Sequence, residues 1–152
     1  MEQSAISKVR PGGKFSDIQK QTFEELYSGL QKIGFLNASV SLTQYSELGL
    51  GRLFMPHSLG HFLGLYTHDV GECTSQKVRE ETISVCQSIT SPNIQLEPGM
   101  VTTIEPGFYF IPSLVSKFQT DPKTKDCFDF ARIGEYMHLG GVRIEDNILV
   151  QN

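Results

Sequence analysis

The sequence predicts an α+β fold in which helices come first and strands later. Two observations indicate this order. Residues 16–34 repeat apolar side chains at helical spacing, whereas β-branched and aromatic residues concentrate in residues 100–112 and 139–150. The chain has 152 residues, 39% of them hydrophobic, which is enough for one unit with a hydrophobic core.

The longest helix is predicted over residues 16–34. Ser16 is expected to be its N-cap, with Gln19 three residues later as in a capping box, and Gly34 is expected to end it. A stripe of apolar residues on this helix is expected to pack into the core: Phe23, Leu26, Tyr27, Leu30 and Ile33.

Three further segments are predicted: a short helix and a turn before the longest helix, and a long loop before the strands. A short helix containing residues 5–9 is expected first, followed by a turn in the RPGG at residues 10–13. The polar stretch at residues 72–95 has few large apolar side chains and is predicted to be a long loop.

The first strand region, residues 100–112, reads MVTTIEPGFYFIP. Its β-forming residues predict one strand before Pro106 and Gly107, a break at those two residues, and a second strand from Phe108.

The second strand region, residues 139–150, is predicted to contain a similar interruption. Val142 and Ile144 should face one side and Arg143 and Glu145 the other, because successive side chains of a strand alternate. Residues 146 and 147, Asp-Asn, are expected to turn the chain into a last strand.

Charge and cysteine content exclude several classes of partner. Thirteen basic and seventeen acidic side chains give a net charge of −4, and no stretch concentrates Lys or Arg, so no nucleic acid is expected as a partner. No run of about 18 apolar residues and no apolar leader segment occurs, so no membrane is expected either. Cys73, Cys86 and Cys127 form no CxxC pair, which fits a reducing compartment, and a cytoplasmic location is expected.

Three of the four histidines of the chain fall within residues 53–72: His57, His61 and His68. Imidazole is both a metal ligand and a group that transfers protons near neutral pH, so this cluster suggests a metal site or acid–base chemistry. Hydrogen-bonded packing in a glycine-rich loop is the alternative.

Two carboxylates support a metal site. Glu105 in TIEPG and Glu145 in VRIED are surrounded by β-branched and apolar neighbours, where burying an unpaired carboxylate is costly. A divalent cation would compensate them, and an imidazole with carboxylates suits Mn²⁺, or Co²⁺ and Zn²⁺ with less selectivity. Alternatively, the two glutamates pair with Arg143, Arg132 or backbone amides at strand ends.

Three strings, MPHSLGHFLGLYTHDVG, LEPGMVTTIEPGFYF and GGVRIEDNILV, together resemble the C-terminal part of Xaa-Pro dipeptidases (prolidases). These belong to the pita-bread metallopeptidases, as do aminopeptidase P and methionine aminopeptidase. The resemblance extends from about residue 4 to residue 150. It implies a partial pita-bread (creatinase/aminopeptidase-like) fold, a curved antiparallel sheet covered by helices, and hydrolysis of the peptide bond before proline.

The resemblance also implies a set of metal ligands. His61 of GHFLG matches the metal-binding histidine, Glu105 the first metal-binding glutamate, and Glu145 the glutamate that bridges two metals. Two Mn²⁺ ions are implied for the intact site, where they activate water for attack on the carbonyl.

Other residues acquire roles through the same resemblance. His57 is implied to touch the substrate peptide, and His68 to bind substrate and steady the tetrahedral intermediate. Glu105 is also implied in catalysis by proton transfer. Arg143 would orient the carboxylates around the metals.

The family's first two ligands are aspartates that precede the matched region, and the only aspartate ahead of His61 is Asp17, at the helix start. We therefore expect residues 1–152 to be a truncated catalytic domain that lacks the N-terminal domain and the first part of the catalytic domain. Its remaining ligands would hold one cation, and the chain alone should be inactive.

A second departure concerns specificity. Prolidases place an arginine before the EPGM segment, yet residues 80–104 contain no arginine or lysine, and Arg79 lies well upstream. Glu72 also replaces a family glycine. Xaa-Pro peptides are the implied substrates, without an expected preference for dipeptides.

Two rival functions differ in kind from a metallopeptidase. The chain could be a non-catalytic remnant that binds a peptide or a partner chain, including a second copy in a homodimer, through exposed sheet edges. The other rival is a nucleophilic hydrolase that uses Cys73 and His68, for which no orienting partner is recognisable.

Overall fold

A computed structural model describes residues 1–69 and 94–152. The predicted loop at 72–95 therefore lies almost wholly outside the described residues, as do Glu72, Cys73, Arg79 and Cys86. The described chain forms two compact units. Unit 1 comprises Met1–Thr22, the described part of Ser58–Pro106, and Glu145–Asn152, and unit 2 comprises Phe23–His57 and Gly107–Ile144.

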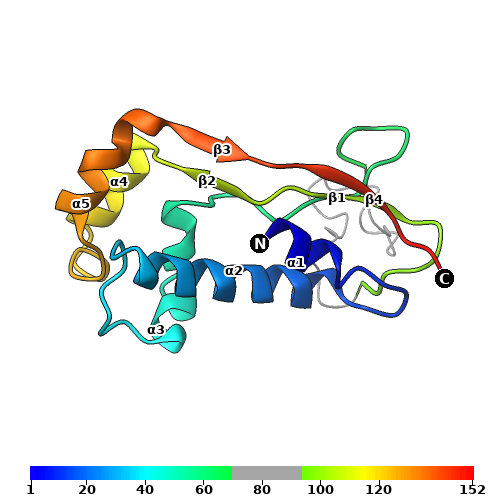
Figure 1. Cartoon of the computed structure of the whole chain (residues 1–152), viewed down its shortest axis with the longest axis horizontal. Helices are drawn as coiled ribbons and strands as arrows, with labels where there is room; N and C mark the ends of the chain where they lie inside the picture. The colour runs from blue at the N-terminus through cyan, green and yellow to red at the C-terminus, as the bar shows by residue number, and fades with distance from the viewer. Residues whose placement is uncertain (70–93) are drawn as a thin grey trace, which may run out of the picture. The chain divides into compact units, whose positions relative to one another are not determined.

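Unit 1 is built around one antiparallel strand pair (Figure 1). Strand β1, Val101–Ile104, pairs with β4, Asp146–Leu149, and this register sets Ile104 opposite Asp146. Helix α1, Glu2–Ile6, and the start of α2, Phe15–Lys32, belong to this unit. Its core contains Ala5, Phe15, Ile18, Leu59, Leu96, Ile104 and Val150.

The N-terminal side of α2 differs from the prediction. The helix begins at Phe15, so Ser16 lies inside its first turn and is not the N-cap. Gln19 does not complete a capping box: its Oε1 accepts a hydrogen bond from the backbone N–H of Leu59 at 2.9 Å. The local pattern assigned the Gln19 side chain to the helix cap, but in the fold this side chain bonds to the backbone of a residue 40 positions away.

The elements before α2 are shifted but present. Helix α1 spans Glu2–Ile6 rather than residues 5–9. The predicted turn at residues 10–13 is confirmed, with Gly12 at a φ of +76°. Backbone hydrogen bonds of 2.8 Å from Gly12 to Leu96 and from Leu96 to Gly13 attach this turn to a distant part of unit 1.

Unit 2 combines short helices with a second strand pair (Figure 1). Strand β2, Gly107–Tyr109, pairs antiparallel with β3, Gly141–Arg143. The rest of α2 belongs here, together with three α-helices, α3 (Leu42–Glu47), α4 (Pro112–Thr120) and α5 (Phe130–Tyr136), and two short 3₁₀ helices, η1 (Leu50–Leu53) and η4 (Met137–Leu139).

Helix α2 ends at Lys32, and Gly34, the residue predicted to stop it, follows with a φ of +75°. The N–H of Phe35 donates to the carbonyl of Leu30 at 2.9 Å and that of Gly34 to Gln31 at 3.0 Å, a Schellman C-cap that a glycine accommodates without strain. Leu30 is buried as predicted, but Ile33 is 43% exposed, so the last residue of the apolar stripe is not in the core.

The strand regions confirm the predicted interruptions and correct one turn. The β1–β4 ladder ends at Ile104 and the β2–β3 ladder begins at Gly107. Between them, the Glu105 N–H donates to the Leu59 carbonyl at 2.8 Å, and Pro106 has no N–H to donate. Asp146 is not in a turn: with its neighbour Asn147 it lies in β4, paired with residues of β1. These cross-strand partners outweigh the turn preference of an Asp-Asn pair.

Burial does not distinguish the two faces predicted for residues 142–145, so the prediction that Val142 and Ile144 share one face stays a prediction. All three residues of β3 are exposed, and so is Ile144. Its one strand neighbour among residues 1–69 and 94–152 is β2, so the other edge of β3 is unpaired there. None of the described helices has the length and apolar character that crossing a bilayer requires.

Candidate functional site

Three predicted ligands converge in unit 1. One ligand atom each of His61, Glu105 and Glu145 lies within 4.8 Å of the other two. Glu105 directly follows β1 and Glu145 directly precedes β4, so the pairing of Ile104 with Asp146 brings both carboxylates to the same end of the ladder. The prediction that these three side chains lie together is confirmed.

His61 reaches this group because its backbone lies directly against β1. Its N–H donates to Thr103 Oγ1 at 3.0 Å, and its carbonyl accepts from the Thr103 N–H at 2.9 Å. Gly60 makes this approach possible: a Cβ there would overlap the carbonyl oxygen of Thr103 and lie 3.0 Å from Phe15 Cζ.

The hydrogen bonds of His61 define its tautomer. Nδ1 lies 2.8 Å from the carbonyl oxygen of Phe62, and because a carbonyl only accepts, Nδ1 carries the proton. In the neutral ring Nε2 is then an acceptor, and it faces Glu105 Oε1 at 3.2 Å. Two facing acceptors need a proton or a cation between them, so this contact fits a metal site.

The two glutamates differ in burial. Glu105 is 6% exposed, and its Oε1 also accepts a hydrogen bond from Thr103 Oγ1 at 3.0 Å. Glu145 is exposed, so the expectation that both carboxylates are buried is wrong for Glu145. It precedes β4, three of whose four residues are exposed.

His68 lies beside the ligand group, with its ring centroid 4.5 Å from that of His61. An isolated antiparallel bridge between Phe62 and Asp69 closes the intervening loop and returns His68 toward His61. A side chain at Gly64 would overlap the Asp69 carboxylate, so this glycine allows the loop to close.

Glu2 is an acidic neighbour that sequence reasoning missed. Burial, reinforced by the nearby carboxylates of Asp146 and Glu145, raises the pKa of Glu2 to about 7. Both of its carboxylate oxygens are inaccessible to solvent. The raised pKa favours the protonated, uncharged form of Glu2 in the folded chain, so Glu2 is an acidic group whose charge depends on pH close to the ligand group. No local pattern marks Glu2, because α1 meets this region only in the folded chain.

The other predicted site residues form a second group within unit 2. The ring of His57 packs edge-on against Tyr109 at 5.5 Å, and Arg143 Nε donates to the Tyr109 hydroxyl at 2.6 Å. Gly107 and Gly141 leave room for the tyrosine, since a Cβ at either position would overlap its ring. Sequence reasoning did not single out Tyr109, which lies four residues after the predicted ligand Glu105 in EPGFY.

The thiol of Cys127 does not suit nucleophilic chemistry. It is buried, and burial, together with the charge of Asp126, raises its pKa, which disfavours the thiolate. Cys73, the thiol of the rival hydrolase hypothesis, lies outside the described residues.

Comparison with protein families gives one match along the whole chain. The family model of metallopeptidase family M24 matches residues 1–152. Among curated proteins, Xaa-Pro dipeptidase 1 of Idiomarina loihiensis is 36% identical over 146 residues, covering 95% of this chain and 32% of the relative. The Xaa-Pro dipeptidase of Rattus norvegicus is 36% identical over 147 residues, covering 97% and 29%. The chain thus spans about a third of the length of these relatives.

Solved structures agree with the sequence comparison. A variant of Escherichia coli aminopeptidase P in complex with substrate matches 99% of this chain and 26% of its own, with a TM-score of 0.66 and 27% identity. Zinc-substituted aminopeptidase P in complex with product matches with a TM-score of 0.64 and 27% identity. The predicted α+β class and partial pita-bread fold are therefore confirmed.

Proposed function

Because this chain belongs to metallopeptidase family M24, we propose that it carries part of the active site of a peptidase that hydrolyses the bond before proline. Its similarity to Xaa-Pro dipeptidases supports this substrate class. The observation that carries the proposal is the contact of His61 Nε2 with Glu105 Oε1, completed by Glu145.

His61, Glu105 and Glu145 are the proposed metal ligands. One imidazole nitrogen and two carboxylates suit Mn²⁺, and also Co²⁺ and Zn²⁺. When bound, such a cation supplies Lewis-acid activation of water and of the scissile carbonyl. The family resemblance implies two ions in the intact site; with three ligand side chains together, this chain is proposed to hold one.

The remaining roles follow from the chemistry of each side chain. Glu105, fixed by the Thr103 hydroxyl, is proposed to move a proton between water and the leaving amine. His68, beside His61, is proposed to donate a hydrogen bond to the developing oxyanion.

His57 is proposed to contact the substrate peptide, and Arg143 to act as a positioning residue. The edge-on contact of His57 with Tyr109 and the hydrogen bond from Arg143 Nε to the Tyr109 hydroxyl restrict how both side chains lie, which supports these roles. The proposed substrates are Xaa-Pro peptides longer than dipeptides, because residues 80–104 lack the arginine that would bind a dipeptide carboxylate.

We also propose that these 152 residues do not hydrolyse peptides by themselves. A two-metal mechanism needs more ligands than the three that converge, and the two aspartates implied by the family resemblance are not among them. The alternative function, a peptide- or protein-binding module, predicts no dependence on metal.

Calorimetric titration with Mn²⁺ tests the metal site. The expected result is one weakly bound ion per chain, with an affinity that falls more than about a hundredfold in Glu105→Gln. Glu135→Gln, an exposed glutamate in unit 2, is the matched control and should bind as the parent does.

Hydrolysis of Xaa-Pro dipeptides and tripeptides is measured on the same samples. No turnover above background is expected. Tight binding of two ions, or turnover that disappears in Glu145→Gln, would contradict the proposed inactivity. Absence of any Mn²⁺ binding would favour the binding-module alternative.

A further inference from the structure

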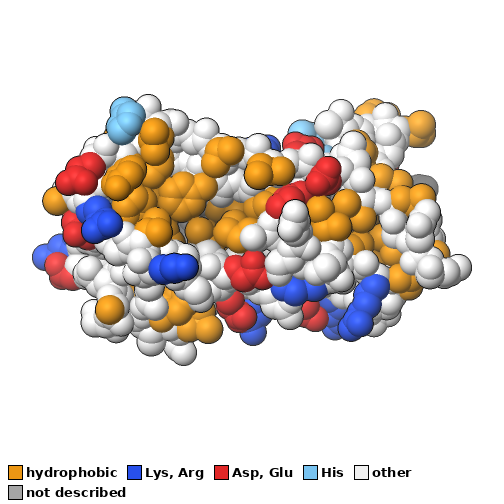
Figure 2. Space-filling model, in the orientation of Figure 1, with side chains coloured by type: hydrophobic (Ala, Val, Ile, Leu, Met, Phe, Trp, Pro, Cys, Tyr) orange, Lys and Arg blue, Asp and Glu red, His pale blue; other side chains and the backbone are white. Residues whose placement is uncertain are grey.

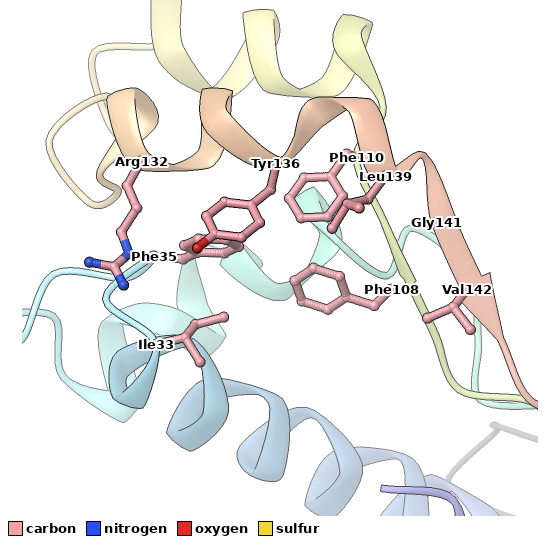
Figure 3. A pocket seen from close by; sticks show the side chains of 9 residues that line it. All are labelled: Ile33, Phe35, Phe108, Phe110, Arg132, Tyr136, Leu139, Gly141 and Val142. Atoms are coloured by element: carbon pink, nitrogen blue, oxygen red, sulfur yellow. The ribbon is translucent and has the colours of Figure 1, made fainter.

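Unit 2 contains a hollow that the proposed function does not use (Figure 3). Its volume is about 510 Å³, and its walls come from the end of α2, from β2 and β3, and from α5 and η4. Sites for small organic ligands in proteins enclose roughly 300–1,000 Å³, so this hollow has the size of a small-molecule site.

The floor of the hollow is aromatic and internally packed. The rings of Phe35 and Tyr136 meet edge to face at 5.4 Å, and those of Phe108 and Phe110 at 5.4 Å. Phe108 also stacks on the fully buried Phe54 at 4.6 Å. Because each ring is held by its neighbours, the floor is already formed before anything binds.

The rim is aliphatic and open to water. Ile33, Leu139 and Val142 are 43%, 58% and 60% exposed. Figure 2 shows hydrophobic side chains gathered over this part of unit 2. Since exposed apolar surface is unfavourable in water, an apolar ligand that covers these residues would be stabilised there.

One end of the hollow is cationic. Arg132 is the one charged residue in the lining, and Figure 3 shows its guanidinium and the Tyr136 hydroxyl on the same side. The guanidinium lies against Gly34, with Nη1 3.5 Å from the position of a Cβ there. Its nitrogens form no hydrogen bond or ion pair with residues in 1–69 or 94–152, and Asp129 Oδ1 accepts from the backbone N–H of Arg132 instead.

From this arrangement we propose that the hollow binds a small apolar monocarboxylate of the medium-chain fatty-acid class. The aliphatic tail would cover the aromatic floor, and the carboxylate would accept hydrogen bonds from Arg132 and the Tyr136 hydroxyl. This proposal does not depend on the proposed peptidase function.

Charge complementarity selects this ligand class over others. The lining contains Arg132 and no Asp or Glu, so its net positive charge repels a cationic ligand. A neutral apolar ligand would contact the floor but leave the guanidinium with water alone. Binding of a second copy of the chain, or of another protein, to the same face would be a different outcome, and the test distinguishes it.

The probes are decanoate and its uncharged analogue decan-1-ol. Their binding is detected by methyl NMR of the whole chain. Decanoate should bind once per chain and shift the methyl signals of Ile33, Leu139 and Val142. Decan-1-ol should bind about tenfold more weakly. Arg132→Gln should weaken decanoate about tenfold and leave decan-1-ol unchanged, whereas Arg52→Gln, an exposed arginine of the same unit, should change neither.

A second variant tests the location independently of Arg132. Leu139→Asp removes apolar surface from the exposed rim and places a negative charge there, so it should abolish binding of decanoate and weaken binding of decan-1-ol without affecting folding. Equal affinity for the two probes, or no effect of Arg132→Gln on decanoate, would overturn the proposal. Methyl shifts that follow protein concentration alone would also overturn it, because a second copy would then cover the face.

Discussion

The two strand pairs of this chain have the same antiparallel topology but different surroundings. In unit 1, β1 has three of its four residues buried, whereas in unit 2 all three residues of β3 are exposed. Helix α1 contacts β1, and the backbone at residues 59–63 hydrogen-bonds to it. β3 has β2 beside it and otherwise exposes its apolar side chains.

This difference in burial determines which kind of site each strand pair can form. The covered strand β1 is held by neighbours on several sides, so the ligand atoms of His61 and Glu105 meet at 3.2 Å. The exposed strand β3 leaves Val142 at the edge of an aromatic hollow instead. In unit 1, the closely packed strand β1 holds polar side chains together. In unit 2, the exposed strand β3 borders an apolar hollow. Four substitutions test this comparison.

The largest effect is expected from Gly60→Ala in unit 1. The new Cβ would overlap a backbone carbonyl of β1, which cannot move aside as a flexible side chain can. We expect a loss of about 4 kcal/mol or more in the free energy of unfolding, with loss of Mn²⁺ binding. Gly29→Ala is the control: nothing lies within 4 Å of its Cβ, so α2 should become slightly more stable. Unchanged Mn²⁺ binding in Gly60→Ala would show that the contact with β1 does not position His61.

Phe54→Ala tests the packing of unit 2. Phe54 is fully buried and its ring contacts those of Phe35, Phe108, Phe110 and Phe128. Its removal should cost about 3–5 kcal/mol and disorder the floor of the hollow. Chemical denaturation gives the stability. If Mn²⁺ binding by unit 1 persists under native conditions while decanoate binding is lost, the two sites are independent, as the comparison implies.

Glu2→Gln tests the acidic surroundings of the ligand group. The pKa of Glu2 is raised from 4.5 to about 7, so its protonated form is favoured in the folded chain. This contribution is complete below pH 4.5 and is lost as the pH rises through about 7. At pH 8 the variant should be about 1–2 kcal/mol more stable than the parent, allowing for partial exposure, and should show no gain at pH 4. Denaturation at both pH values measures this, and the exposed Glu97→Gln should show no such difference.

The smallest effect is expected from Tyr45→Phe. The hydroxyl of Tyr45 is buried without a hydrogen-bond partner among the described residues, and burial raises its pKa. Removing this hydroxyl should stabilise the chain by about 1 kcal/mol, because an unsatisfied polar group is no longer buried. Tyr27→Phe is the contrast: its hydroxyl donates to the Val40 carbonyl at 2.9 Å, so that variant should be less stable. Destabilisation by both changes would mean that the Tyr45 hydroxyl has a partner in solution.

The sequence by itself determined the features that depend on near neighbours in the chain. Apolar spacing located α2, and Gly34 marked its end because only a residue tolerant of positive φ closes that helix easily. Pro106 marked the strand break because it has no N–H. The strings around His61, Glu105 and Glu145 pointed to the proposed ligands through their resemblance to a metallopeptidase family, whereas residue types alone left ion pairs of the glutamates as an alternative.

Only the tertiary structure decided which side chains are covered and which distant groups meet. Ile33 continues the helical stripe yet lies at the rim of a hollow, and Gln19 bonds to Leu59 rather than to its own helix end. Glu2 lies near Glu145 although almost the whole chain separates them. Burial and charge at such positions depend on the packing of elements far apart in sequence, and a local pattern carries no information about that packing.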